Sequence, residues 1–173
     1  MNLPNILTIF RLFLIPVFLM VFFSGTPNYL LYSIIVFLIA GMTDILDGYI
    51  ARKYNLVTKW GIVLDPLADK LMLLTVLSSL SIKNIIPSWI FVVVAMKEVL
   101  MIISGLFLYK KDTVIPSNIF GKASTLLFYI SIFTLGFNPM AGDNLLYIAV
   151  ASAVVALINY VIIYFRNHKN NKD

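Results

Sequence analysis

Six apolar stretches, separated by short polar breaks, run through the whole chain. They cover residues 7–23, 30–51, 60–82, 87–109, 121–137 and 144–165. The breaks lie at residues 24–28, 52–59, 83–84, 110–116 and 138–143. Each stretch is close to the ~20 residues with which a helix crosses a bilayer, and short connections favour antiparallel neighbours. The pattern predicts an all-α integral membrane bundle of six transmembrane helices.

Composition supports the membrane interpretation. Hydrophobic residues make up 61% of the chain and charged residues 12%, whereas soluble proteins carry roughly 25% charged residues. The 173 residues are expected to form a single domain, residues 1–173. Cysteine is absent, which excludes disulfides and thiolate metal sites.

The net charge of +5 would suggest a nucleic-acid partner in a soluble protein, but here the basic residues follow the loops. Those expected on one side are Arg52, Lys53, Lys59, Lys110, Lys111, Lys122, Arg166, Lys169 and Lys172, whereas the opposite loops contain only Lys83. Because cytoplasmic loops are enriched in Lys and Arg, both termini are predicted to be cytoplasmic. We therefore expect a multi-pass protein of the cell membrane that binds no nucleic acid.

Four aspartates gather at the predicted cytoplasmic boundary of the second and third stretches: Asp44, Asp47, Asp65 and Asp69. On helices, spacings of three and four residues place each pair on one face. Carboxylates in such apolar surroundings are costly and should face one another, a cation or water. Hard oxygen ligands suit Mg²⁺, Mn²⁺ or Ca²⁺, and four carboxylates could serve two ions.

Other residues near the aspartates suggest phosphate chemistry. Arg52 lies one turn beyond the first pair and offers a planar donor fork for a phosphate, and Gly48 and Gly61 allow close approach. Metal ligands, a phosphate-binding arginine and glycines together indicate phosphoryl-type transfer. A cation carrier that uses the aspartates as its ion path is the rival interpretation, although carriers tend to show paired repeats, and none is evident here.

The residues D-x2-D-G-x2-A-R-x8-G-x3-D-x3-D, from Asp44 to Asp69, resemble the signature of the CDP-alcohol phosphotransferase family. The resemblance implies a six-helix transmembrane fold with a two-metal site, Mg²⁺ or Mn²⁺, that opens to the cytoplasm. It also implies a homodimer that transfers a phosphatidyl group from CDP-diacylglycerol to an alcohol and releases CMP. A non-catalytic relative would have no reason to keep four costly carboxylates.

The resemblance also suggests a role for each site residue. Metal ions would be held by Asp44, Asp47, Asp65 and Asp69, and Asp69 is our candidate general base. The expected CDP-diacylglycerol contacts are Asn5, Thr8, Gly48, Ala51, Arg52, Thr58 and Gly61. Arg11 either reaches a lipid headgroup by snorkelling or faces the site.

Two acceptors are compatible with the sequence. The chain is most similar to bacterial phosphatidylglycerophosphate synthases, whose acceptor is glycerol 3-phosphate. Where those relatives have Arg, Arg and Lys, this chain has Lys97, Phe107 and Ser124. Lys97, Lys122 and Arg11 remain as candidate acceptor-binding residues, although Lys97 could instead form a private ion pair with Glu98. A less basic pocket also fits a cardiolipin synthase, whose acceptor is phosphatidylglycerol.

Overall fold

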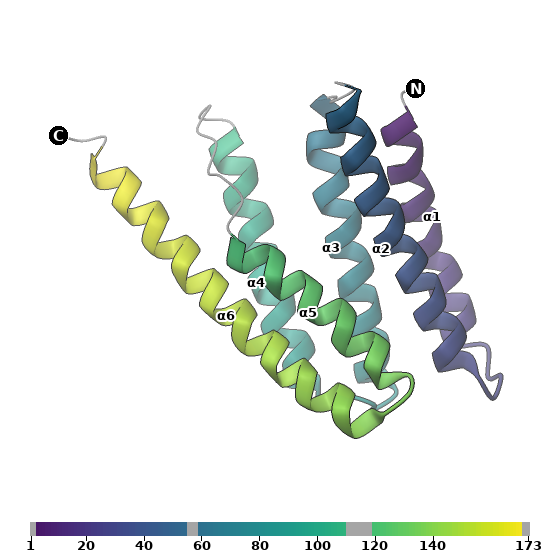
Figure 1. Ribbon diagram of the computed structural model, residues 1–173. Coiled ribbons are helices and arrows are strands. Elements are labelled where there is room, and N and C mark those ends of the chain that lie inside the picture. The colour runs from purple at the N-terminus through teal and green to yellow at the C-terminus, as the bar shows by residue number, and fades with distance from the viewer. Residues whose placement is uncertain (1–2, 55–58, 110–118, 171–173) are drawn as a thin grey trace. The chain divides into compact units, whose positions relative to one another are not determined.

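The computed structural model describes residues 3–54, 59–109 and 119–170, and the regular elements within these ranges are all α-helices (Figure 1). Side chains are described for residues 5–51, 53–54, 61, 64–101, 121 and 123–159. The helices are α1 (Leu3–Phe22), α2 (Tyr29–Lys53), α3 (Lys59–Ile82), α4 (Ser88–Tyr109), α5 (Ile119–Leu135) and α6 (Pro139–Asn170). For these residues the prediction of an all-α fold is confirmed.

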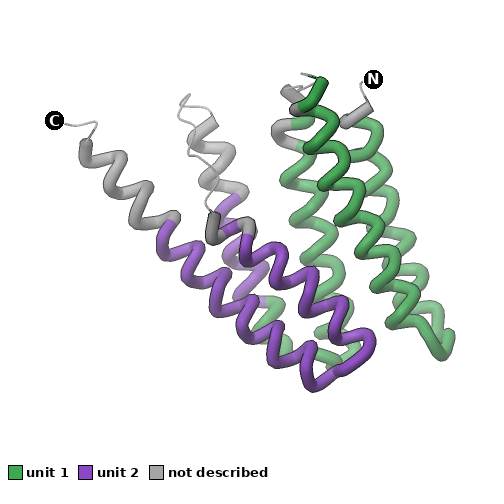
Figure 2. Tube along the Cα trace, viewed as in Figure 1, with its two compact units in different colours: residues 1–91 green, residues 92–173 purple. Residues whose placement is uncertain are grey.

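The chain divides into two compact units, residues 1–91 and 92–173, and the boundary falls inside α4 (Figure 2). The first unit contains α1, α2 and α3. The second contains most of α4 together with α5 and α6.

In the first unit, α1 packs against both α2 and α3. Figure 1 shows that the start of α1, the end of α2 and the start of α3 lie at the same end of this unit. Each of the three helices contributes fully buried apolar side chains, among them Phe18, Phe37, Met72 and Leu77. Because the motif aspartates lie in the second half of α2 and the first half of α3, this packing carries them to the same end.

Two tight turns close the other end of the first unit. Gly25, between α1 and α2, has a φ of 74°, which glycine adopts without a steric penalty. Asn84 ends α3 with a φ of 55°, and the Ile85 amide donates to the Leu80 carbonyl at 2.9 Å. This pairing is typical of a helix terminated by a left-handed residue. Both turns fall in breaks that the polar pattern predicts.

In the second unit α5 and α6 lie side by side and are joined by a short turn (Figure 1). The predicted break over residues 138–143 is wrong, because α6 begins at Pro139. The Asn138 side chain accepts a hydrogen bond from the Ala141 amide at 3.1 Å, and Pro139 occupies the first helical position. Asn at the cap and Pro immediately after it form a strong helix start, so the polar residues here belong to the first turn of α6.

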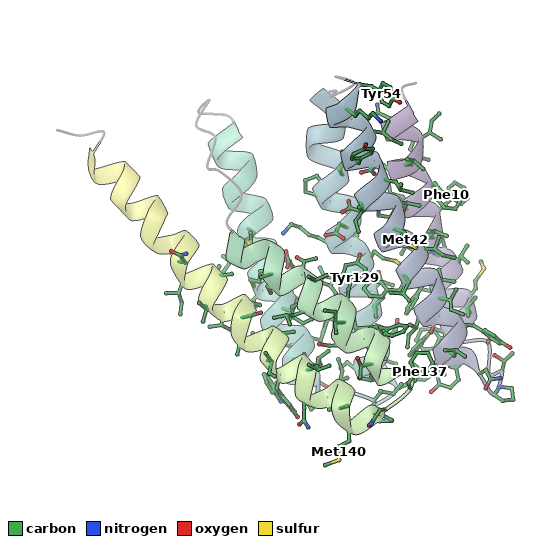
Figure 3. All side chains as sticks on the ribbon, viewed as in Figure 1. Phe10, Met42, Tyr54, Tyr129, Phe137 and Met140 are labelled. Atoms are coloured by element: carbon green, nitrogen blue, oxygen red, sulfur yellow. The ribbon has the colours of Figure 1, made fainter. Side chains whose placement is uncertain are left out.

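Three described helices are long and apolar enough to cross a membrane: Asn5–Phe22 in α1, Tyr29–Ala51 in α2 and Pro139–Asn159 in α6. Their outer faces are apolar as well. Phe10 and Met42 are 46% and 63% exposed, and Figure 3 shows Phe10 on the outer side of α1. Such exposure would be costly in water, and a lipid environment removes the cost. The structure therefore agrees with a membrane protein.

Candidate active site

A stripe of three polar residues runs along α1. Asn5, Thr8 and Arg11 are three residues apart, and the other positions of this helix are apolar. At that spacing the three side chains share one helix face. Thr8 and Arg11 are buried, so the stripe faces the interior of the first unit.

Arg11 connects α1 to both helices that carry the aspartates. Its Nη1 lies 2.7 Å from Oδ1 of Asp44, and its Nη2 lies 2.5 Å from Oδ2 of Asp47. Nη1 also donates to the backbone carbonyl of Asp65 on α3, at 3.4 Å. The Arg11 side chain has no exposed surface, so the snorkelling interpretation is wrong and Arg11 faces the aspartates.

Thr8 contributes a second contact to α3, one turn before Arg11. Its hydroxyl donates to Oδ1 of Asp65. The carboxylates of Asp44, Asp47 and Asp65 therefore all contact the polar stripe of α1. The expectation that Asp44 and Asp47 share a face is confirmed, because both contact one guanidinium.

The Arg11 guanidinium pairs with two carboxylates, those of Asp44 and Asp47, whereas the Asp65 carboxylate accepts from Thr8. Asp47 is almost fully buried, with 3% of its side chain exposed, whereas 40% of the Asp44 side chain is exposed. Clustered carboxylates repel one another and attract further positive charge. The carboxylate oxygens of Asp44, Asp47 and Asp65 are ligands of the type that a hard divalent cation prefers. In the structure, however, Asp44 and Asp47 contact Arg11. Among the residues whose side chains are described, no three acidic, His or Cys residues are grouped so that they could hold a metal ion.

Other predicted site residues of the first unit lie along the same helices. Gly48 and Ala51 are half-buried on α2, one and two turns beyond Asp44; Gly61 is buried on α3, one turn before Asp65; Asn5 and Asp69 are half-buried. The side chain of Arg52, at the end of α2, and the whole of Thr58 lie outside the described residues. The contacts proposed for those two therefore stay predictions.

In the second unit, Lys97 forms a buried ion pair with its neighbour Glu98, with Lys97 Nζ 2.5 Å from Oε1 of Glu98. The private ion pair considered from the sequence is present. Ser124 on α5 is also buried, and its hydroxyl has no hydrogen-bond partner among the described residues. The side chains of Phe107 and Lys122 lie outside the described residues.

Sequence reasoning left open the role that the structure gives to Arg11 and did not anticipate the contact between Thr8 and Asp65. The signal was present, because Asn5, Thr8 and Arg11 are the polar residues of an otherwise apolar α1. A polar stripe on a membrane helix should face protein and find polar partners there. The aspartates of α2 and α3 were the available partners.

Comparisons with known proteins agree with the motif. The family model for CDP-alcohol phosphatidyltransferases matches residues 1–162. A protein of Rickettsia bellii named CDP-diacylglycerol–glycerol-3-phosphate 3-phosphatidyltransferase is 37% identical over 159 residues, which is 91% of this chain and 86% of that protein. A protein of the same name from Rickettsia felis is 35% identical over the same shares. One from Haemophilus influenzae is 46% identical over 76 residues, covering 44% of this chain and 41% of its own. The chain belongs to the CDP-alcohol phosphatidyltransferase family.

Proposed function

We propose that this protein transfers a phosphatidyl group from CDP-diacylglycerol to glycerol 3-phosphate and releases CMP. The observation that carries the proposal is the convergence of Asp44 and Asp47 from α2 and Asp65 from α3 on the polar stripe of α1. These three aspartates belong to the motif that marks the family. The two Rickettsia relatives, which are named for this reaction and each match 91% of the chain, are the reason for proposing glycerol 3-phosphate as the acceptor.

A divalent cation, Mg²⁺ or Mn²⁺, is part of the proposal, with Asp44, Asp47, Asp65 and Asp69 as its ligands and two ions as the expected number. When bound, such a cation would polarise the pyrophosphate and neutralise the charge that develops on it. Arg52 and the backbone at Gly48 would bind the nucleotide phosphates. Asn5, Thr8, Ala51, Thr58 and Gly61 would line the remainder of the CDP-diacylglycerol site.

The chain's own residues would then move the acceptor proton. The acceptor hydroxyl oxygen forms a bond to the diacylglycerol-linked phosphorus, and the bond from that phosphorus to the oxygen of CMP breaks. Asp69 takes the proton of the hydroxyl as general base. Its position one turn beyond Asp65 on the same face of α3 is the reason for choosing it. Lys97, Lys122 and Arg11 are the proposed cations for the phosphate of the acceptor.

We also propose that residues 1–173 form one multi-pass domain with six transmembrane helices and both termini in the cytoplasm. The distribution of Lys and Arg supports this topology, and three apolar helices of sufficient length support membrane insertion. The end of the first unit that carries the aspartates would then face the cytoplasm, where nucleotide and metal are available. A homodimer in the cell membrane is the expected assembly.

The proposal is tested by incubating the purified protein with CDP-diacylglycerol, Mg²⁺ and either glycerol 3-phosphate or phosphatidylglycerol, and identifying the lipid product. We expect phosphatidylglycerophosphate from glycerol 3-phosphate, together with CMP. The second candidate acceptor is phosphatidylglycerol, because Ser124 is uncharged at a position where the resemblance to phosphatidylglycerophosphate synthases leads us to expect Lys. Cardiolipin as the product, with glycerol 3-phosphate inert, would establish that alternative.

A further inference from the structure

We propose that Arg11 is a built-in counter-cation that holds Asp44 and Asp47 in position while the divalent cation is absent and competes with that cation for them. The inference rests on the proposed function, because it assumes that these aspartates bind a divalent cation. It makes Arg11 a positioning residue of the metal site, in addition to the acceptor-binding role considered above.

The contacts of Arg11 support this role. The guanidinium uses Nη1 for Oδ1 of Asp44 and Nη2 for Oδ2 of Asp47. Any cation that takes these oxygens as ligands must weaken or displace the two ion pairs. Without some positive charge among them, the aspartates would repel one another in a buried setting, and Arg11 supplies that charge.

A second feature indicates that this position of Arg11 can be given up. The Nε of Arg11 is buried and has no hydrogen-bond partner among the described residues. Reaching both aspartates therefore leaves one guanidinium donor unsatisfied, which is unfavourable in a buried site. Asp44, with 40% of its side chain exposed, offers the route by which a cation can arrive.

The proposal predicts that removing Arg11 destabilises the protein when the cation is absent and strengthens binding of the cation when it is present. In excess EDTA, Arg11→Gln should lower the Tm of the purified protein in detergent. Saturating Mn²⁺ should raise the Tm of this variant by more than it raises that of the wild type. Mn²⁺ binding, measured by electron paramagnetic resonance, should be about tenfold tighter or more, because one competing unit charge is gone.

Lys97→Gln is the matched control. It also removes a buried cation from an ion pair, but the pair does not involve the motif aspartates. The Tm of Lys97→Gln should lie below that of the wild type by the same amount in EDTA and in Mn²⁺. If Arg11→Gln does not fold in EDTA, Arg11→Lys takes its place. Lysine keeps the positive charge but lacks the two guanidinium nitrogens that contact both aspartates, so Mn²⁺ should raise the Tm of this variant by an intermediate amount.

Several results would overturn the inference. An equal Tm rise with Mn²⁺ in Arg11→Gln, Arg11→Lys and the wild type would make Arg11 a structural residue, and the metal site would stand. Weaker Mn²⁺ binding by Arg11→Gln would exclude competition and also leave the metal site standing. If Mn²⁺ neither binds to nor stabilises any variant, including the wild type, both the inference and the proposed metal site fail.

Discussion

At the scale of single residues, the main feature of the site is the balance between its carboxylates and the cation that contacts two of them, Arg11. Arg11 neutralises part of an acidic cluster that α2 and α3 bring into an apolar interior. Breaking a buried ion pair from one side is costly because the remaining charge has no partner. Thr8 satisfies one oxygen of Asp65 without adding charge. The cluster therefore keeps an excess of carboxylates over cations, which suits the metal-assisted chemistry that we propose.

The hydrogen bond from Thr8 to Asp65 can be tested by Thr8→Val, which keeps the shape of the side chain and removes the donor. We expect the free energy of unfolding to fall by about 1–3 kcal/mol, because Asp65 loses a partner in a partly buried site. Thr75→Val is the control, since the Thr75 hydroxyl donates to the Leu71 carbonyl of its own helix; its effect should stay within about 0.5 kcal/mol. Equal effects in chemical unfolding would show that the contact between helices adds nothing.

Substitutions of Asp69 and Asp44 should have different effects, because we propose different roles for the two residues. Asp69→Asn should remove turnover while CDP-diacylglycerol still binds, because the proposed base acts only in the chemical step. Asp44→Asn should instead weaken metal and nucleotide binding together. Single-turnover kinetics and direct binding of CDP-diacylglycerol distinguish the two. If Asp69→Asn keeps about a tenth of wild-type turnover or more, a loss too small for a missing general base, the assignment is wrong.

The spacing of the aspartates predicted part of this arrangement. Asp44 and Asp47, three residues apart, had to share a face of α2, and both contact Arg11. That Arg11 would lie between them could not be derived, because it depends on how α1 is rotated against α2. Periodicity shows which residues share a face of a helix, but it does not say which face of another helix lies opposite.

At the scale of elements, apolar runs and turn residues located the helices, and capping decided their ends. The φ of 55° at Asn84 and of 74° at Gly25 fall in breaks that the sequence marks. The start of α6 was placed too late, because Asn138 and Pro139 were interpreted as part of a loop although they cap and begin a helix. Polarity alone does not distinguish a loop from the first turn of a helix.

Two glycines of the second unit, Gly142 in the first turn of α6 and Gly121 near the start of α5, allow a paired test. A Cβ on Gly142 would lie 2.5 Å from the Cα of Leu135, whereas a Cβ on Gly121 would meet no atom of the described residues within 4 Å. Gly142→Ala should therefore destabilise the protein by about 1–3 kcal/mol through forced backbone shifts. Gly121→Ala should leave it unchanged or up to about 1 kcal/mol more stable. Thermal unfolding in detergent measures both, and a neutral Gly142→Ala would mean that the two helices pack less closely there.

At the scale of the whole molecule, composition and charge distribution indicated a membrane protein before any helix was placed. Hydropathy could not predict how the helices divide into two units, because it measures how apolar each stretch is and not which stretches pack together. The family motif, residues 44–69, lies in the first unit, and this is where we propose that the chemistry takes place. The proposed acceptor residues Lys97 and Lys122 belong to the second unit.

Topology can be tested directly because the chain has no cysteine. Single cysteines would replace Lys53, at the end of α2, and Ser24, in the connection that precedes α2; both residues are exposed. Each variant would be probed with a membrane-impermeant maleimide in right-side-out vesicles. Ser24→Cys should react at once, and Lys53→Cys only after permeabilisation, because basic loops stay in the cytoplasm. Immediate labelling of Lys53→Cys would reverse the proposed orientation.

The central claim is that clustered aspartates and a divalent cation together transfer a phosphatidyl group. Its most direct test is the initial rate of CMP release from CDP-diacylglycerol in the presence of glycerol 3-phosphate, measured with Mg²⁺, with excess EDTA, and with Mg²⁺ restored. We expect release with Mg²⁺, none with EDTA and full recovery on restoration, since the carboxylates supply oxygen ligands but no Lewis acid of their own. Undiminished CMP release in excess EDTA, or no release under any condition, would contradict the claim.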